Sequence, residues 1–192
     1  MVALATLLSV VPFFRLFNGG SVTLCSMLPI VLIAYKHGWK WGLLTGFTDG
    51  LLQLLLGASD LKGLSMGAVF GSILLDFVLA FTVLGLAGVF RKKIKAPALS
   101  IGVGTLLVTL LRFGFHILSG YLVFGGFATY FFEQFQFGAY FIQNVSGSAY
   151  VWMYTLIYNG LYMIPEIIIT TLVAVLLLCI PAVKKLVSSP KT

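Results

Sequence analysis

Apolar residues run through this chain in six long segments, separated by short polar or charged stretches. A helix that crosses a bilayer needs about 20 mostly apolar residues, and we interpret each segment as one crossing. The first two are short for a crossing, whereas the last can tilt, or kink at Pro165. The segments cover about residues 1–14, 22–35, 39–57, 64–90, 97–123 and 149–183. This pattern predicts an all-α polytopic membrane protein with six transmembrane helices, in a single integral membrane domain over residues 1–192.

The composition also indicates that the apolar segments are surrounded by lipid. Hydrophobic residues make up 60% of the chain and charged residues only 9%, and the mean hydropathy is +1.08. Soluble domains carry about 25% charged residues. A soluble fold of this size has too little interior to hide so much apolar surface.

The net charge of +7 does not indicate a nucleic-acid partner, because the cations cluster at the ends of apolar segments. Positive charge flanking spans on one side is the pattern of cytoplasmic loops. It predicts a cell-membrane protein with both termini in the cytoplasm and outer loops at residues 15–21, 58–63 and 124–148. The clusters hold nine of the twelve cations: Lys36 and Lys40, then Arg91, Lys92, Lys93 and Lys95, then Lys184, Lys185 and Lys191.

The third outer loop is rich in aromatic residues and has one charge, Glu133. Such a segment is typical of the aromatic belt at a membrane surface. A lid over a binding site is the alternative interpretation, and the sequence does not decide between them. Small residues also recur at Gly42, Gly46 and Gly50, a spacing that lets helix backbones approach closely within the protein or against a partner.

Ionisable residues inside membrane segments are costly and usually functional. Here they are Asp49, Asp76, Arg112, His116 and Glu166. Asp76 stands among apolar neighbours with no cation one helical turn away. We therefore expect it to be the counter-ion of a ligand, a neutral structural acid, or the ion-pair partner of Arg112.

Polar and aromatic side chains in the last two segments complete a candidate site. Arg112 and His116 are four positions apart and share one helix face, although His116 is equally typical of a structural histidine bonded between helices. Tyr154 and Asn159 add an aromatic ring and an amide, unless they only belong to a kinked helix. A carboxylate among aromatic faces is suited to a small, flat, cationic organic ligand.

The chain lacks two sequence motifs that would indicate an enzyme. No Gly-Lys pair of a phosphate-binding loop and no His-Glu-x-x-His zinc motif occurs. We therefore predict no enzymatic activity, no cofactor and no metal site, and we expect any ATP hydrolysis to reside in partner subunits.

Four stretches in order resemble the ThiT family, the thiamine-binding S components of energy-coupling factor (ECF) transporters. They are residues 19–30, 74–81, 112–120 and 154–166, and the similarity extends over nearly the whole chain. The resemblance implies a six-helix S-component fold with thiamine bound near the outer face. It also implies an energising partner of one transmembrane coupling subunit and two ATPase subunits.

The resemblance assigns a role to each candidate residue. Asp76 would face the thiazolium cation and Phe124 would stack on the ligand. Arg112 would meet the hydroxyethyl end or a phosphate. The groups that would hold the pyrimidine and its surroundings are His116, Tyr154 and Asn159.

Two positions depart from the family pattern, because Phe77 stands where Tyr is usual and Val78 where Pro is common. An S component for another vitamin, or a non-transporting membrane scaffold with a structural polar core, are therefore the alternatives.

Overall fold

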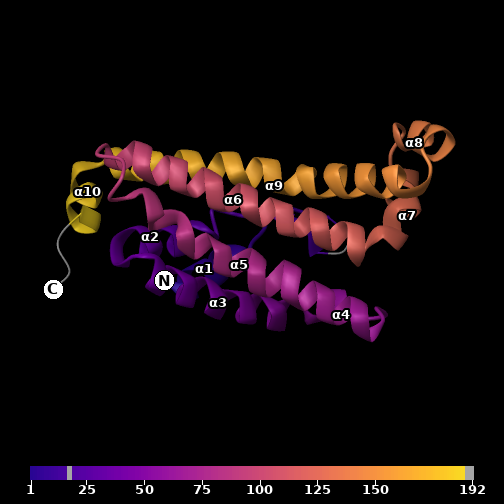
Figure 1. Cartoon of the computed structure of the whole chain (residues 1–192), viewed down its shortest axis with the longest axis horizontal. Helices are drawn as coiled ribbons and strands as arrows, with labels where there is room; N and C mark the ends of the chain where they lie inside the picture. The colour runs from indigo at the N-terminus through magenta and orange to yellow at the C-terminus, as the bar shows by residue number, and fades with distance from the viewer. Residues whose placement is uncertain (17–18, 189–192) are drawn as a thin grey trace.

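The computed structural model describes residues 1–16 and 19–188 and shows an elongated helical bundle (Figure 1). Each of the six predicted segments contains a helix, and the prediction of an all-α membrane fold is confirmed. Lys191 and positions 17–18 of the first predicted outer loop lie outside the described residues. The first half contains α1 (Val2–Val10), β1 (Phe14–Arg15), β2 (Ser21–Val22), α2 (Leu28–His37), α3 (Trp39–Leu56) and the 3-10 turn η2 (Ala58–Leu61).

The second half begins with a helix that changes its winding along its length. The segment Met66–Phe90 is an α-helix, then a π-helix, then a short α-helix, then a 3-10 helix. The elements are α4 (Met66–Ser72), η3 (Ile73–Leu79), α5 (Ala80–Thr82), η4 (Val83–Phe90), α6 (Pro97–Leu122), η5 (Gly125–Phe127), α7 (Ala128–Glu133), α8 (Gly138–Asn144), α9 (Gly147–Cys179) and α10 (Pro181–Ser188).

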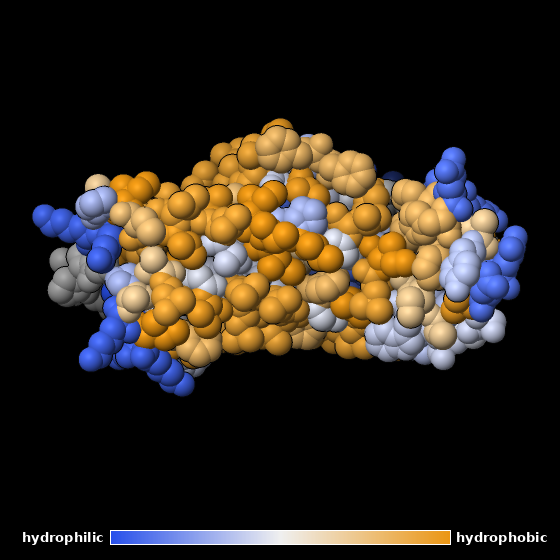
Figure 2. Space-filling model, turned by 90° about the horizontal axis from the view of Figure 1, so that it is seen from above, coloured by the Kyte–Doolittle hydropathy of each residue, from blue (hydrophilic) through white to orange (hydrophobic). Residues whose placement is uncertain are grey.

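Three helices of the described residues are long and apolar enough to cross a membrane, namely Met66–Phe90, Pro97–Leu122 and Gly147–Cys179. The α9 helix continues through Pro165. Seen from above, the molecule has a broad hydrophobic surface between two ends that carry hydrophilic residues (Figure 2). This distribution is that of a protein whose middle is surrounded by lipid.

The first two segments differ from their prediction. The helix expected over residues 1–14 ends at Val10, and the helix expected from residue 22 begins at Leu28. Between them, Phe14 pairs with Val22 and Arg15 with Ser21 in a short antiparallel hairpin. Hydropathy does not distinguish an apolar strand from an apolar helix, so these boundaries were predicted wrongly.

The predicted third outer loop is not a plain loop either. It folds into η5, α7 and α8 at the end of the molecule opposite α10 (Figure 1). Phe131 and Phe132 of α7 are fully buried, whereas Tyr130 and Tyr140 are exposed. The segment therefore packs one aromatic face inward against α9 and turns the other outward.

The rest of the bundle is held by α6 packed along α9, and by η4 packed against α2, α3 and α6. Glycines make the closest of these contacts. A β-carbon placed on Gly104 would lie 2.0 Å from the carbonyl oxygen of Ala87. No larger residue fits such a contact without moving a backbone, which explains the small residues of these helices.

Candidate functional site

A cavity of about 350 Å³ opens between the hairpin, α3, the 66–90 helix, α6 and α9. This volume is within the range of small-molecule sites, about 300–1,000 Å³. All the site residues predicted from the sequence line it, although they come from three separate helices and the turn after α6. They are Asp76, Arg112, His116, Phe124, Tyr154 and Asn159.

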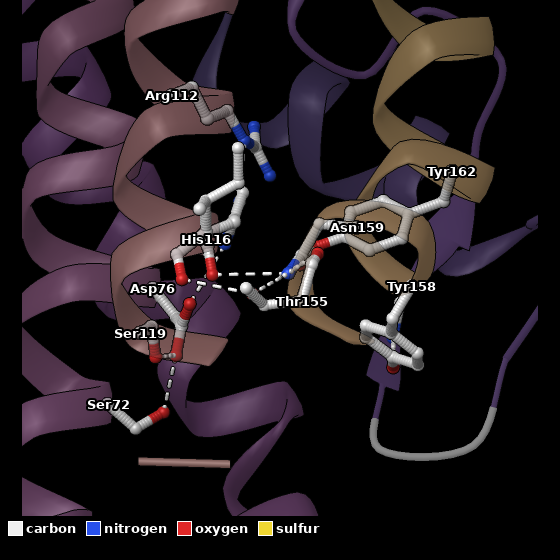
Figure 3. A network of polar contacts seen from close by, with 11 residues as sticks. Ser72, Asp76, Arg112, His116, Ser119, Thr155, Tyr158, Asn159 and Tyr162 are labelled. Carbon is white, nitrogen blue, oxygen red and sulfur yellow. Dashed lines mark hydrogen bonds and ion pairs between the residues drawn. The ribbon is translucent and has the colours of Figure 1, made fainter. Parts of the chain in front are cut away.

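Asp76 lies in the middle of the π-helix η3, and its side chain points toward Ser72, His116 and Ser119 (Figure 3). Its Oδ2 accepts hydrogen bonds from the Ser72 hydroxyl at 2.8 Å and from the Ser119 hydroxyl, and its Oδ1 lies 2.9 Å from Nδ1 of His116. The neighbours of Asp76 in the sequence are apolar, but the fold gives it three polar partners, two of them from α6. A π-turn widens a helix and often marks a functional site.

His116 connects Asp76 to Arg112. The Arg112 Nε donates a hydrogen bond to the His116 Nε2 at 3.2 Å. Because guanidinium nitrogens only donate, Nε2 must accept, and the proton of a neutral imidazole then sits on Nδ1 and points at Asp76. In this tautomer His116 is uncharged and donates its hydrogen bond to Asp76.

Arg112 does not form an ion pair with Asp76. Within the described residues, the ion pair between charged side chains joins Arg15 to Asp60, whereas the neutral His116 contacts Asp76 through a hydrogen bond. The Arg112 guanidinium lies instead over the Phe81 ring, with Cζ at 4.0 Å from its centroid. The alternative in which Arg112 neutralises Asp76 directly is therefore wrong. A carboxylate offers about four lone-pair positions, and the protein uses three of those on Asp76.

Asn159 is held in place by two residues of its own helix and by the His116 carbonyl of α6, to which its amide nitrogen donates at 3.3 Å. Its amide nitrogen donates to the Thr155 carbonyl at 2.8 Å and lies 3.0 Å from the Thr155 hydroxyl. Its Oδ1 accepts from the Tyr162 hydroxyl at 2.7 Å. One lone pair of Oδ1 remains for a ligand donor, so the amide can act toward a ligand mainly as an acceptor.

Three tyrosines of α9 form the aromatic wall of the cavity. Tyr154, Tyr158 and Tyr162 recur every fourth residue and so share one helix face. The Tyr162 ring stands edge-on to His116 at 5.9 Å between centroids. Behind the wall, the buried Phe131 ring lies 5.5 Å from the ring of Tyr154.

Comparison with known proteins identifies the family. Residues 1–186 match the family described as thiamine transporter protein (Thia_YuaJ). This chain belongs to the thiamine transporter family. It is 33% identical over 192 residues to the thiamine transporter ThiT of Bacillus subtilis (strain 168), with 92% of this chain and 85% of that protein covered.

Two further relatives agree with this assignment. The thiamine transporter ThiT of Lacticaseibacillus paracasei is 26% identical over 146 residues, covering 70% of this chain and 61% of that protein. The solved structure of ThiT from Listeria monocytogenes superposes with a TM-score of 0.69 at 20% identity, covering 95% of this chain and 91% of that one. The resemblance predicted from sequence motifs is thus confirmed, and the fold is that of a ThiT structure.

Sequence reasoning about this thiamine transporter family member missed Tyr158, Tyr162 and Gly20 as site residues. The backbone N–H of Gly20 donates to the Tyr158 hydroxyl at 3.3 Å. A β-carbon at Gly20 would lie 2.7 Å from Cδ1 of Tyr162. The four-residue tyrosine spacing was a usable signal, whereas the approach of Gly20 is a tertiary contact that no local pattern indicates.

Glu166 was recognised as a membrane-embedded acid but received no role. The structure places it on the cavity wall, where its Oε1 accepts from the Thr23 hydroxyl at 2.7 Å and from the Thr23 backbone N–H. Thr23 directly follows β2, so Glu166 attaches the hairpin to α9. At the other side of the hairpin, Arg15 pairs with Asp60 at 3.4 Å.

Proposed function

We propose that this protein is the thiamine-capture subunit of an ATP-driven importer of the ECF type. The observation that carries the proposal is the Asp76 carboxyl group at the wall of an aromatic cavity, where the described residues occupy three of its roughly four acceptor positions. A thiazolium ring is a flat cation, which is favoured by a nearby carboxylate and by aromatic faces. Membership of the thiamine transporter family supports the same ligand.

The charges around the cavity favour a ligand with one positive charge. Its lining contains the carboxylates Asp60, Asp76 and Glu166 and the cations Arg15 and Arg112. The lining therefore has three acidic side chains and two basic ones, one more acidic than basic, with His116 neutral. Because unbalanced charge within a membrane is costly, a monocation stabilises this site more than a neutral ligand of the same shape.

We assign roles to the other cavity residues from the resemblance to the thiamine transporter family. Phe124 stacks on the ligand at the end of α6, and Tyr154 closes the aromatic wall. His116 and Asn159 meet the pyrimidine and its neighbouring groups. Arg112 orients His116 and faces the hydroxyethyl end.

The proposed transport step needs partners. The chain has no phosphate-binding loop, so the free energy of import comes from an energising module of one transmembrane coupling subunit and two ATPase subunits. Both termini and the lysine-rich segments lie in the cytoplasm, and the hairpin and α7 face outward around the cavity. Closure of these outer segments over thiamine precedes delivery.

The direct test measures binding to the purified protein by isothermal titration calorimetry. Thiamine should bind saturably at one site, and its uncharged aminopyrimidine fragment at least tenfold more weakly, because a charge-assisted contact is worth about 1.5–3 kcal/mol. The absence of saturable thiamine binding would refute the proposal. Tyrosine fluorescence, quenched as ligand covers the α9 wall, gives an independent readout.

A competition series distinguishes thiamine from another vitamin. Thiamine, its phosphates and riboflavin are each titrated against bound thiamine. Tighter binding of riboflavin than of thiamine would assign the S component to a different substrate. Equal, weak and unsaturable signals for all of them would favour the scaffold alternative.

A further inference from the structure

Arg91 brings together three basic segments that are far apart in the chain. Its Nη1 donates to the carbonyl oxygens of Tyr35 at 2.8 Å and Lys36 at 2.6 Å, and its Nη2 donates to the carbonyl of Val187 at 3.3 Å. The guanidinium also lies 5.5 Å from the Tyr35 ring centroid. The end of α2, the segment after η4 and the helix α10 therefore meet at one place.

Lysines surround this junction, and within the part of the chain that the structure describes no Asp or Glu belongs to its three segments. The five Asp and Glu side chains are in α3, η2, η3, α7 and α9. Within residues 1–16 and 19–188, none of the lysines forms an ion pair. Arg91 itself is used in bonds to backbone carbonyls, so the lysines provide the accessible charge. We call them the lysine cluster: Lys36, Lys92, Lys93, Lys95, Lys184 and Lys185.

Apolar side chains adjoin the lysine cluster. Leu186 follows its last two lysines and is 63% exposed, and Val89 precedes Arg91 on the exposed surface of η4. Trp39 and Trp41, at the start of α3, are also exposed, and tryptophan concentrates at the level of lipid headgroups. Figure 2 shows hydrophilic groups at this end, directly beside the hydrophobic surface.

A ligand that fits both features has an anionic head and apolar chains. We infer that the lysine cluster binds an anionic diacyl phospholipid from the leaflet at this end of the bundle. The phosphodiester lies against the lysines around Arg91, and the acyl chains lie along the apolar surface of η4 and α10. Basic clusters beside membrane helices recognise such headgroups through charge at short range. This inference is independent of what the cavity binds.

Native mass spectrometry of the full chain tests it, with phosphatidylglycerol and phosphatidylcholine of identical acyl chains as probes. The unaltered protein should retain phosphatidylglycerol preferentially, and high salt should reduce that preference. The double variant Lys184→Gln, Lys185→Gln should bind phosphatidylglycerol at least about fivefold more weakly, because each lysine contributes to anionic-lipid binding. The matched control is Lys62→Gln, an exposed lysine outside the cluster, which should change nothing.

Four results would overturn the inference. One is equal retention of the two lipids by the unaltered protein, which needs no variant to fold. Another is an equal loss in the double variant and in Lys62→Gln. The third is a double variant that keeps its lipid preference but no longer associates with its coupling partner, because the cluster would then be a protein contact. Competition by glycerol 3-phosphate as strong as by the lipid would also refute a role for the acyl chains.

Discussion

The region around η4 and the region around the cavity are packed in different ways. Around η4, backbones touch: a β-carbon on Gly85 would lie 2.2 Å from the carbonyl carbon of Gly42, and one on Gly88 would lie 2.1 Å from the carbonyl oxygen of Ala34. Around the cavity, aromatic rings stand 5–6 Å apart and polar groups bond to one another. Close backbone contact leaves no space for a ligand, whereas rings and hydrogen bonds can border one.

One helix contributes to both regions, and its helix type changes between them. The segment Met66–Phe90 is a wide π-helix where Asp76 meets the cavity and a narrow 3-10 helix where Gly85 meets α3. A 3-10 helix has about three residues per turn and a π-helix bonds five residues apart. The narrow 3-10 part of this helix accompanies the close backbone approach to α3. The wide π part carries the carboxylate that points into the cavity.

The largest expected effect comes from filling the closest backbone contact. Gly85→Val should lower the free energy of unfolding by about 3 kcal/mol or more, because overpacking here must displace the backbone of α3. Thermal unfolding in detergent measures it. The control Gly67→Val adds the same side chain where nothing lies within 4 Å. Similar losses in both variants would show that the contact at Gly85 has no special importance.

Asp76→Asn should leave folding nearly intact and weaken thiamine binding by about 1–3 kcal/mol, the scale of a charge-assisted contact. The uncharged aminopyrimidine fragment should lose much less. Calorimetry on both ligands gives the comparison, and Glu133→Gln removes an exposed carboxylate as a control. Equal losses for the two ligands would remove Asp76 from its counter-ion role.

Asn159→Ala should produce the opposite selectivity. It removes the acceptor oxygen beside the proposed pyrimidine position, so the aminopyrimidine fragment should lose about 0.5–1.5 kcal/mol of binding free energy, the scale of one neutral hydrogen bond. The same titrations measure it. A fragment affinity that does not change would place the pyrimidine elsewhere in the cavity.

Phe131→Leu tests whether α7 supports the aromatic wall. Loss of ring contacts worth about 0.5–1.5 kcal/mol each should loosen Tyr154 and Tyr158 and speed ligand dissociation. Phe137→Leu is the matched control, since Phe137 is exposed and does not line the cavity. If both variants release ligand at the normal rate, α7 serves as a surface segment and not as a support.

The smallest effect is expected at the hairpin. Arg15→Gln breaks the exposed pair with Asp60 and should cost less than about 1 kcal/mol. Ligand dissociation should accelerate slightly in stopped-flow fluorescence, and added salt should abolish the difference because it screens the pair. A difference that persists at high salt would assign Arg15 a role other than this ion pair.

The sequence predicted the residues of the site better than it predicted the boundaries of the first two helices. Asp76, Arg112 and His116 could be found because ionisable groups are rare inside membrane segments, and the last two share a helix face. The hairpin at Phe14–Arg15 and Ser21–Val22 could not be found, because its apolar residues have no helix-specific period. The burial of Phe131 could not be predicted either, because an aromatic belt at the membrane surface and a lid over a binding site have the same composition.

The sequence by itself determined that the apolar segments lie in lipid and that the fold is helical. It also determined the family and the residue types at the cavity, because all of these depend on local composition and spacing. Only the tertiary structure decided that Asp76 bonds to Ser72, Ser119 and His116, that Arg112 orients His116 and forms no ion pair with Asp76, and that Glu166 holds Thr23. Partners contributed by different helices depend on how the helices rotate and approach one another. Those rotations are set by packing over the whole bundle, which no local pattern in the chain specifies.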